Sequence, residues 1–180
     1  DPKSAIACYH DLMRQRTERR AAHIGGGSTR SLTTASGTRQ GTQEATIAVV
    51  RLCRSDGQAV ETIRSGEGIL AELEIDAPPS IEDFALTVGV FNEGHVKCFE
   101  ATIASVQGTL GKVSPHSSIQ CHLKHLPLLS GSYFINVGIY PTDWSYVYDF
   151  HWQMHPVTVF DERTSNSQAG GIVAVETHWT

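Results

Sequence analysis

The sequence predicts an all-β protein, an antiparallel β-sandwich preceded by a short helix and a flexible linker. From residue 45 onward, apolar residues recur at every second position in short runs. Clusters of Gly, Pro, Asn and Asp separate these runs roughly every ten residues, and no helical period appears among them. Short alternating strands with frequent turn signals are typical of two antiparallel sheets packed face to face.

Residues 3–22 have the spacing of a helix. Ile6, Tyr9, Leu12 and Met13 recur three and four residues apart, which places them on one helical face. Four arginines follow, namely Arg14, Arg16, Arg19 and Arg20. They could contact RNA or lipid, but a solvated helix face is the simpler interpretation.

Residues 25–44 are expected to form a flexible linker. They begin with Gly25-Gly26-Gly27 and consist mostly of Gly, Ser, Thr, Gln and Arg, with almost no apolar content. The glycines are not part of a phosphate-binding loop, because the chain contains no Gly-x-x-x-x-Gly-Lys-Ser/Thr motif.

Eight to nine short strands are expected after the linker. They cover residues 45–54, 59–63, 69–77, 84–92, 95–103, 117–125, 133–140, 150–160 and 172–179. The glycine-punctuated stretch 104–116 is long enough for a Greek-key crossover.

The stretch 126–140 combines a tight corner with a strand. The corner Leu-x-x-Gly-x-Tyr ends at Tyr133, and such a corner in a β-sandwich uses the phenol to bind upstream backbone. Beyond it, Ile135, Val137 and Ile139 fall on the inner face of the strand. The outer face carries aromatic rings and an amide, which is unusual for a surface that meets only solvent.

Charge and cysteine content narrow the classes of function. The formal net charge of the 180 residues is -5. Residues 1–44 carry +3 and residues 45–180 carry -8, so an acidic body disfavours nucleic acid as the main partner. No stretch reaches the ~18 apolar residues of a membrane span, and the first residues lack the apolar core of a signal peptide. Four scattered cysteines show neither metal-site nor required disulfide spacing.

Several short motifs stand in a fairly specific order. They are Asp56-Gly57, Ser65-Gly66-Glu67, Phe84…Val88…Gly94…Val96, the run Leu126…Leu129-Ser130-Gly131-Ser132-Tyr133-Phe134-Ile135-Asn136-Val137, and the ending Gly171-Ile172-Val173…Trp179. In this order the chain resembles the carbohydrate-binding C-terminal domain of the ATPase subunit of O-antigen polysaccharide ABC transporters, the Wzt family. The resemblance spans residues 45–180 and the helix around Tyr9.

The resemblance implies an immunoglobulin-like sandwich over 45–180 that binds O-antigen polysaccharide, at its modified non-reducing end, in the cytoplasm before export. It implies that residues 1–24 end a preceding nucleotide-binding domain, which joins the transporter membrane subunit at the inner membrane. It also implies a homodimer formed by exchange of the C-terminal strand. The residues expected in that strand interface are Ile172, Val173, Val175 and Trp179.

No catalytic residue, metal ion or cofactor is expected. The chain lacks the ATPase motifs, and Glu72 and Glu74 alternate outward like a solvated face rather than a glycosidase pair. The pairs His122/His125 and His151/His155 lie on expected strands, where such offsets do not converge on a metal. Two alternatives remain open: a β-sandwich glycan hydrolase, and a purely structural dimerisation domain of the transporter.

A candidate carbohydrate-binding surface combines aromatic faces with planar polar groups. Its expected members are Phe91, Gln120, His122, Phe134, Asn136 and Tyr140. They share one surface only if their strands are neighbours, and small residues (Ala85, Thr87, Gly89 and Gly138) would leave a hollow there. Alternatively, a neighbouring subunit or the loop 143–150 covers these rings. The aromatic cluster of Trp144, Tyr146, Tyr148 and Trp152 has two interpretations. It could form a lid over the sugar, or it could pack at one end of the sandwich.

Overall fold

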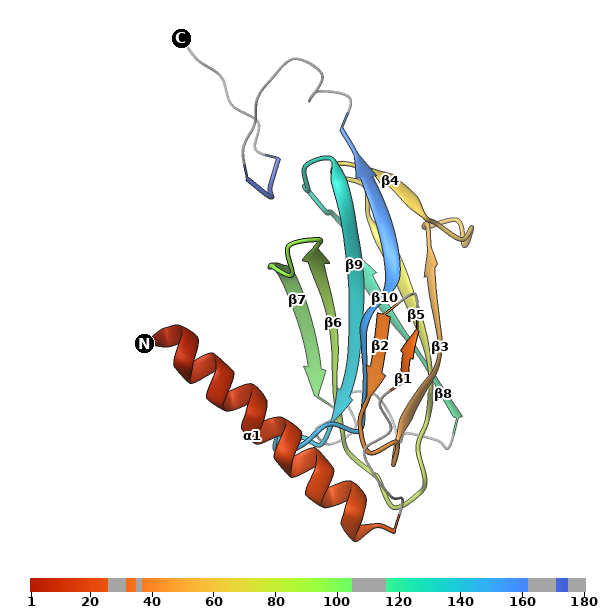
Figure 1. The fold of residues 1–180 in the computed structure, drawn as a ribbon. Helices are drawn as coiled ribbons and strands as arrows, with labels where there is room; N and C mark the ends of the chain where they lie inside the picture. Colours follow the sequence, from red (N-terminus) through yellow and green to blue (C-terminus); the bar gives the residue numbers. More distant parts are fainter. Residues whose placement is uncertain (26–31, 35–36, 105–115, 162–170, 175–180) are drawn as a thin grey trace.

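The structure is a computed structural model that describes residues 1–25, 32–34, 37–104, 116–161 and 171–174 (Figure 1). These residues form one helix and ten strands. The elements are α1 (Pro2–His23), β1 (Leu32–Thr34), β2 (Gly37–Gln40), β3 (Thr46–Cys53), β4 (Thr62–Arg64), β5 (Ile69–Asp76), β6 (Ala85–Asn92), β7 (Lys97–Ala104), β8 (His116–Leu123), β9 (Gly131–Tyr140) and β10 (Asp149–Phe160).

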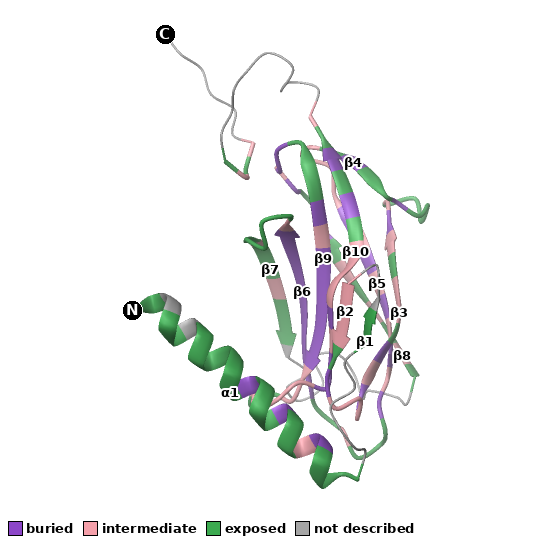
Figure 2. Ribbon diagram, viewed as in Figure 1, coloured by how far each residue is buried: buried purple, intermediate pink, exposed green. Residues whose placement is uncertain are grey.

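The strands form two sheets that pack as a sandwich, which confirms the predicted fold class. Sheet A has the order β1-β2-β10-β9-β6-β7, and β4 pairs with β10 in parallel. Sheet B has the order β3-β5-β8. The other pairings in both sheets are antiparallel. The central strands β6 and β9 of sheet A are the most completely buried (Figure 2).

The core lies between the sheets and follows from the alternation in the sequence. Alternate residues of each central strand point inward, and their apolar side chains interlock. The largest fully buried apolar side chains are Phe84, Ile47, Ile63, Leu73, Ile75, Ile135, Ile139, Val90, Val137, Val157 and Val159. Burying one such side chain stabilises the fold by about 1.5–3 kcal/mol.

The predicted tyrosine corner is confirmed. The Tyr133 hydroxyl donates a hydrogen bond to the carbonyl oxygen of Leu129 over 2.9 Å, and Tyr133 is buried. The bond fixes the chain as it enters β9. The corner therefore sets the position of the strand that carries the outward residues Phe134, Asn136 and Tyr140.

Helix α1 is confirmed, and of the expected face the structure buries Met13 but not Tyr9 or Leu12. Tyr9 and Leu12 are exposed, whereas Met13, Thr17 and Ala21 are buried. These three residues follow a spacing of four, which places them on one face of the helix. The middle one contacts the loop between β9 and β10, where the Val147 N–H donates to the Thr17 hydroxyl over 3.1 Å. The apolar pattern of the sequence does not reveal the buried face of the helix, because Thr17 is polar and Ala21 is small.

An ion pair reinforces the docking of α1. The Arg20 guanidinium forms hydrogen bonds with both carboxylate oxygens of Glu44 and lies 5.6 Å from the centre of the Tyr146 ring. Among the described residues, no helix is long and apolar enough to cross a membrane.

The sandwich begins earlier than Ala45, inside the segment expected to be a flexible linker. β2 pairs with β10, with Thr38 opposite Trp152. Gly37 makes this possible: a Cβ atom there would lie 2.3 Å from the Trp152 carbonyl oxygen, and the Gly37 φ of +130° suits glycine. Residues 26–31 and 35–36 of the expected linker lie outside the described residues.

The described part of the C-terminal segment lies along the corner before β9. The Leu129 N–H donates to the Ile172 carbonyl over 2.9 Å, and the Ala174 N–H donates to the Pro127 carbonyl over 2.7 Å. Val173 pairs with Leu128 in an antiparallel bridge. Val175 and Trp179, the other residues expected in the dimer strand, lie outside the described residues.

Candidate functional site

A continuous row of aromatic rings crosses the outer face of sheet A. Its members, here called the aromatic row, are Phe91, Trp152, Phe150, Tyr140 and Trp144. Successive ring centres lie 5.1 Å apart for Phe91 and Trp152, 6.1 Å for Trp152 and Phe150, 6.4 Å for Phe150 and Tyr140, and 4.8 Å for Tyr140 and Trp144. Phe91 is buried and the other four residues are half-buried.

Two glycines let the rings of the row lie against the sheet. A Cβ atom on Gly138 would lie 2.7 Å from the Tyr140 ring and 2.9 Å from the Phe150 ring. One on Gly89 would lie 2.9 Å from the Phe91 ring. The expected hollow over the small residues is therefore filled by neighbouring rings, because a ring settles where the strand has no side chain.

Polar groups border the aromatic row. The Tyr140 hydroxyl forms a hydrogen bond with the buried Thr87 side chain, and burial is the main cause that raises the pKa of Tyr140. On β7, Lys97 Nζ lies 2.9 Å from a Glu100 carboxylate oxygen and 5.9 Å from the centre of the Phe91 ring. The rings thus stand beside an ammonium–carboxylate pair at the surface, while the hydroxyl pair is buried beneath them.

Asn136 lies on the same face but is only 1% exposed. Its Oδ1 accepts a hydrogen bond from the Gln153 N–H over 2.7 Å. Its Nδ2 is buried without a hydrogen-bond partner. Asn136 thus stabilises the backbone of β10 and does not present its amide to solvent.

The structure brings together four of the six predicted site residues. Phe91, Phe134, Asn136 and Tyr140 share the outer face of sheet A, where β6 and β9 are neighbours. Gln120 and His122 do not join them.

Gln120 and His122 lie on β8, on the outer face of sheet B at the opposite side of the sandwich. Gln120 Nε2 donates to Glu72 over 2.9 Å, and Glu74 on the same face pairs with Arg51. This surface is charged and solvated. The predicted binding surface required the strands that carry its residues to be neighbours. β6 and β9 are neighbours in sheet A, but β8 belongs to sheet B.

Sequence reasoning missed Phe150 and Trp152 as members of this surface. The sequence did contain evidence for this placement. Phe150 and Trp152 occupy even-numbered positions of β10, whereas the buried Val157 and Val159 occupy odd-numbered ones, so the two pairs point to opposite faces of the sheet. Trp152 was grouped with the aromatic loop instead. That loop divides: Trp144 and Trp152 belong to the row, whereas Tyr146 and Tyr148 form an edge-to-face pair at 5.3 Å next to α1.

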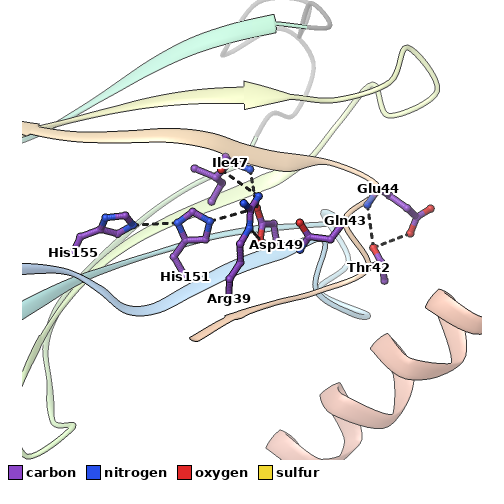
Figure 3. A network of polar contacts seen from close by, with 8 residues as sticks. All are labelled: Arg39, Thr42, Gln43, Glu44, Ile47, Asp149, His151 and His155. Carbon is purple, nitrogen blue, oxygen red and sulfur yellow. Dashed lines mark hydrogen bonds and ion pairs between the residues drawn. The ribbon is translucent and has the colours of Figure 1, made fainter. Parts of the chain in front are cut away.

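A second polar cluster lies inside the sandwich (Figure 3). Asp149 is fully buried and accepts hydrogen bonds from Arg39 (2.6 and 2.9 Å), Gln43 (3.0 Å) and the Ile47 N–H (2.8 Å). His151 Nδ1 and His155 Nε2 lie 3.0 Å apart, so this pair converges, contrary to the expectation for an offset of four on a regular strand, because the strand register shifts between them. The cluster joins β2 and β10 of sheet A to β3 of sheet B.

The two titrating groups of this cluster are shifted in the acidic direction. Burial opposes ionisation of Asp149, but hydrogen bonds from His151, Arg39, Ile47 and Gln43 lower its pKa to about 2. Burial, and then the neighbouring His151, lower the pKa of His155 to about 4. The Asp149 carboxylate at the centre of the cluster is sequestered from solvent, so the cluster holds the sheets together.

There are three candidate regions: the aromatic row on sheet A, the charged outer face of sheet B and the Asp149 cluster. Of these, only the aromatic row presents partly exposed rings with polar neighbours to a ligand. Rings of this kind stack on the C–H faces of sugars, while adjacent hydroxyl and charged groups bind sugar hydroxyls. Within the described part of the chain, no group of three or more His, Cys, Asp or Glu could hold a metal ion.

Comparisons with known proteins agree with this fold. A sequence model described as the Wzt C-terminal domain matches residues 36–175. A solved structure, the crystal structure of the C-terminal domain of wzt, superposes with a TM-score of 0.62 at 13% identity, covering 84% of this chain and 92% of that one. At this identity the superposition shows the fold alone. No curated protein sequence matches the chain.

Proposed function

Since the chain belongs to the Wzt C-terminal domain family, we propose that it binds an O-antigen polysaccharide at its modified non-reducing end and couples completion of the polymer to export. The family is a non-catalytic one that occurs in the context of ABC transporters. A binding module, rather than a glycan hydrolase, is therefore the function to assign.

The aromatic row is the observation that supports polysaccharide binding. Five rings form an unbroken series on one sheet face, and four of them are half-buried. Half-buried rings keep part of their surface free for a ligand while the sheet holds them in place, which lowers the entropy lost on binding. A purely structural dimerisation domain would not need rings arranged in this way.

The proposed partner on the protein side is a preceding nucleotide-binding domain, which would place the chain in the cytoplasm at the inner membrane. Helix α1 supports this arrangement because it docks on the β9–β10 loop through Thr17 and Arg20. The same loop carries Trp144 at one end of the aromatic row. A segment that enters from another domain therefore meets the sandwich beside the proposed binding surface.

The proposed homodimer forms by exchange of the C-terminal strand. Two exposed apolar residues support it: Phe99 is 45% exposed and Ile103 is 38% exposed. Both lie on the inward-facing side of β7, because their partners Val90 and Leu86 on β6 point into the core. Among the described strands, β7 is an edge strand of sheet A and β8 an edge strand of sheet B, so each presents an edge that another strand can cover.

Titration calorimetry of the chain with the O-polysaccharide of the cells that encode it tests the binding function. The polymer is used with its native end group and after that end group has been removed. We expect binding of the native polymer, weaker binding of the trimmed one, and a loss of at least about tenfold in Tyr140→Ala. Phe160→Ala is the matched control, since Phe160 is an exposed aromatic residue outside the row. Equal binding by all three proteins would refute the assignment.

A further inference from the structure

We propose that Trp152 is the central ligand-contacting residue of the chain, that a two-residue bulge held by Asn136 presents it, and that its ligand is an uncharged sugar ring. The inference rests on the proposed function and specifies both the key residue and the chemical class of the ligand.

The bulge is visible in the strand register. His151 pairs with Val137 and His155 pairs with Ile135, so four steps along β10 match two steps along β9. Two extra residues leave the parity of the strand unchanged, which is why Val157 and Val159 still face the core. Gln153 lies in the bulge with a φ of 55°, in the left-handed region that a residue other than glycine adopts at a cost.

Asn136 is the residue that holds the bulge. It is the one residue of β9 between the two paired positions, and its Oδ1 accepts the Gln153 N–H over 2.7 Å. Because Asn136 is 1% exposed, this bond is shielded from water. Gly37 on β2 adds space on the other side of β10, since a Cβ atom there would lie 2.6 Å from the Gln153 carbonyl carbon.

Trp152 occupies the middle of the row as a consequence. β10 and β6 lie on opposite sides of β9, yet the Trp152 ring on β10 is 5.1 Å from the Phe91 ring on β6. The indole must therefore cross β9. It also lies 6.1 Å from Phe150 and 5.7 Å from His95, so among the described residues it has more ring neighbours than any other member of the row, and it alone links β10 to β6.

The charges around Trp152 indicate an uncharged ligand. Among the described residues of β6, β7, β9 and β10, two charged side chains belong to the outer face, Lys97 and Glu100, and they pair with each other over 2.9 Å. Within the described residues of these strands, the outer face therefore has no unpaired cation that could bind an anion. The chain as a whole carries a net charge of -5, which adds repulsion at longer range. A sugar ring with an apolar C–H face matches this surface better than a phosphate or carboxylate does.

The test uses the whole chain and two probes, the neutral and the acidic fragments of the O-polysaccharide separated by anion exchange. Calorimetry gives the affinity for each. We expect the neutral fragments to bind and Trp152→Ala to weaken them by about tenfold or more, with Trp152→Phe losing less because a ring remains. Phe160→Ala on the same strand should bind like the unmodified chain.

A second comparison isolates the role of Asn136 as a positioning residue. Asn136→Leu removes the acceptor for Gln153, whereas Asn136→Asp keeps an acceptor oxygen. We expect the leucine variant to lose both affinity and the near-ultraviolet circular dichroism of the coupled Trp152 and Phe91 rings, and the aspartate variant to recover part of both. Retained dichroism and affinity in Asn136→Leu would overturn the bulge argument.

The outcomes separate this inference from the proposed function. Unchanged affinity in Trp152→Ala together with loss in Tyr140→Ala would keep polysaccharide binding and overturn the central role of Trp152. Tighter binding of the acidic fragments would keep polysaccharide binding and overturn the uncharged class. If neither fraction binds the unmodified chain, both the inference and the proposed function are wrong.

Discussion

The Arg39 guanidinium and the Asp149 carboxylate form a two-pronged pair inside the sandwich, at 2.9 Å and 2.6 Å. Asp149 is fully buried, and the Ile47 N–H of the opposite sheet donates to it over 2.8 Å. Arg39 also donates to the Ile47 carbonyl over 3.3 Å. One ion pair thus bonds to the backbone of β3 in both directions and fixes the spacing of the two sheets.

Replacing Asp149 with alanine should destabilise the chain strongly. The substitution removes the carboxylate that accepts from the half-buried Arg39 and from the buried Ile47 N–H, and breaking a buried pair costs about 3–5 kcal/mol. Urea unfolding measures the loss. The exposed pair of Arg51 and Glu74 is the control, since Glu74→Ala should cost less than about 1 kcal/mol. Equal losses in the two variants would contradict the assignment.

The stability of the chain should fall in acid in two separate ranges. A His pKa of about 4 in the folded state lies below the unfolded value of about 6.5, so the unfolded chain binds the extra proton between these values. The contribution of His155 is complete above pH ~6.5 and is lost as the pH falls towards 4. Asp149, with a pKa of about 2 against about 3.9 when unfolded, contributes above pH ~4 and is lost below it.

His155→Gln tests the first of these ranges. The free energy of unfolding of this variant should vary less between pH 6.5 and pH 4 than that of the unmodified chain. Denaturant unfolding at several pH values provides the measurement. An unchanged slope would show that another group titrates in this range.

Gly138→Ala should displace the rings of the aromatic row that lie against β9. The new methyl group would lie 2.6 Å from the Tyr140 hydroxyl and 2.9 Å from the Phe150 ring, so both rings must move. Overpacking of this kind costs about 1–3 kcal/mol, and polysaccharide binding should weaken with it. Gly131→Ala on the same strand is the control, because a Cβ atom there would meet the Tyr133 ring at 3.6 Å, an ordinary contact distance.

Removing residues 171–180 should weaken self-association. The described part of the deleted segment bonds to Pro127 and Leu129. In the proposed exchange the deletion would also remove the strand that covers an exposed sheet edge of the partner. Sedimentation velocity over a range of concentrations should show a dimer for the intact chain and mostly monomer for the shortened one. A tight dimer without these residues would contradict the proposed strand exchange.

The sequence predicted the fold well because local patterns determine most of it. Alternation over 69–77 and 84–92 matches β5 and β6, and the corner at Tyr133 forms the bond that its motif predicts. The strands of the expected linker were not predictable in this way. β2 is short and polar, and its pairing with β1 and β10 and the Arg39–Asp149 bond make it a strand.

The candidate site was half predictable. Parity along each strand placed Phe91, Phe134 and Tyr140 on outer faces, but parity does not say which strands are neighbours. Gln120 and His122 were included because β8 has the right alternation, although it belongs to the other sheet. The bulge after His151 also has no local signal, so the burial of Asn136 and the placement of Trp152 follow only from the three-dimensional register.

The claim that the outer face of sheet A binds the polysaccharide is tested most directly by nuclear magnetic resonance of the isotopically labelled chain. Addition of the O-polysaccharide should shift the signals of Trp152, Phe150 and Tyr140 and leave those of Gln120 and His122 on sheet B in place. Shifts confined to Gln120 and His122, or no shifts with a polymer that calorimetry shows to bind, would contradict the account.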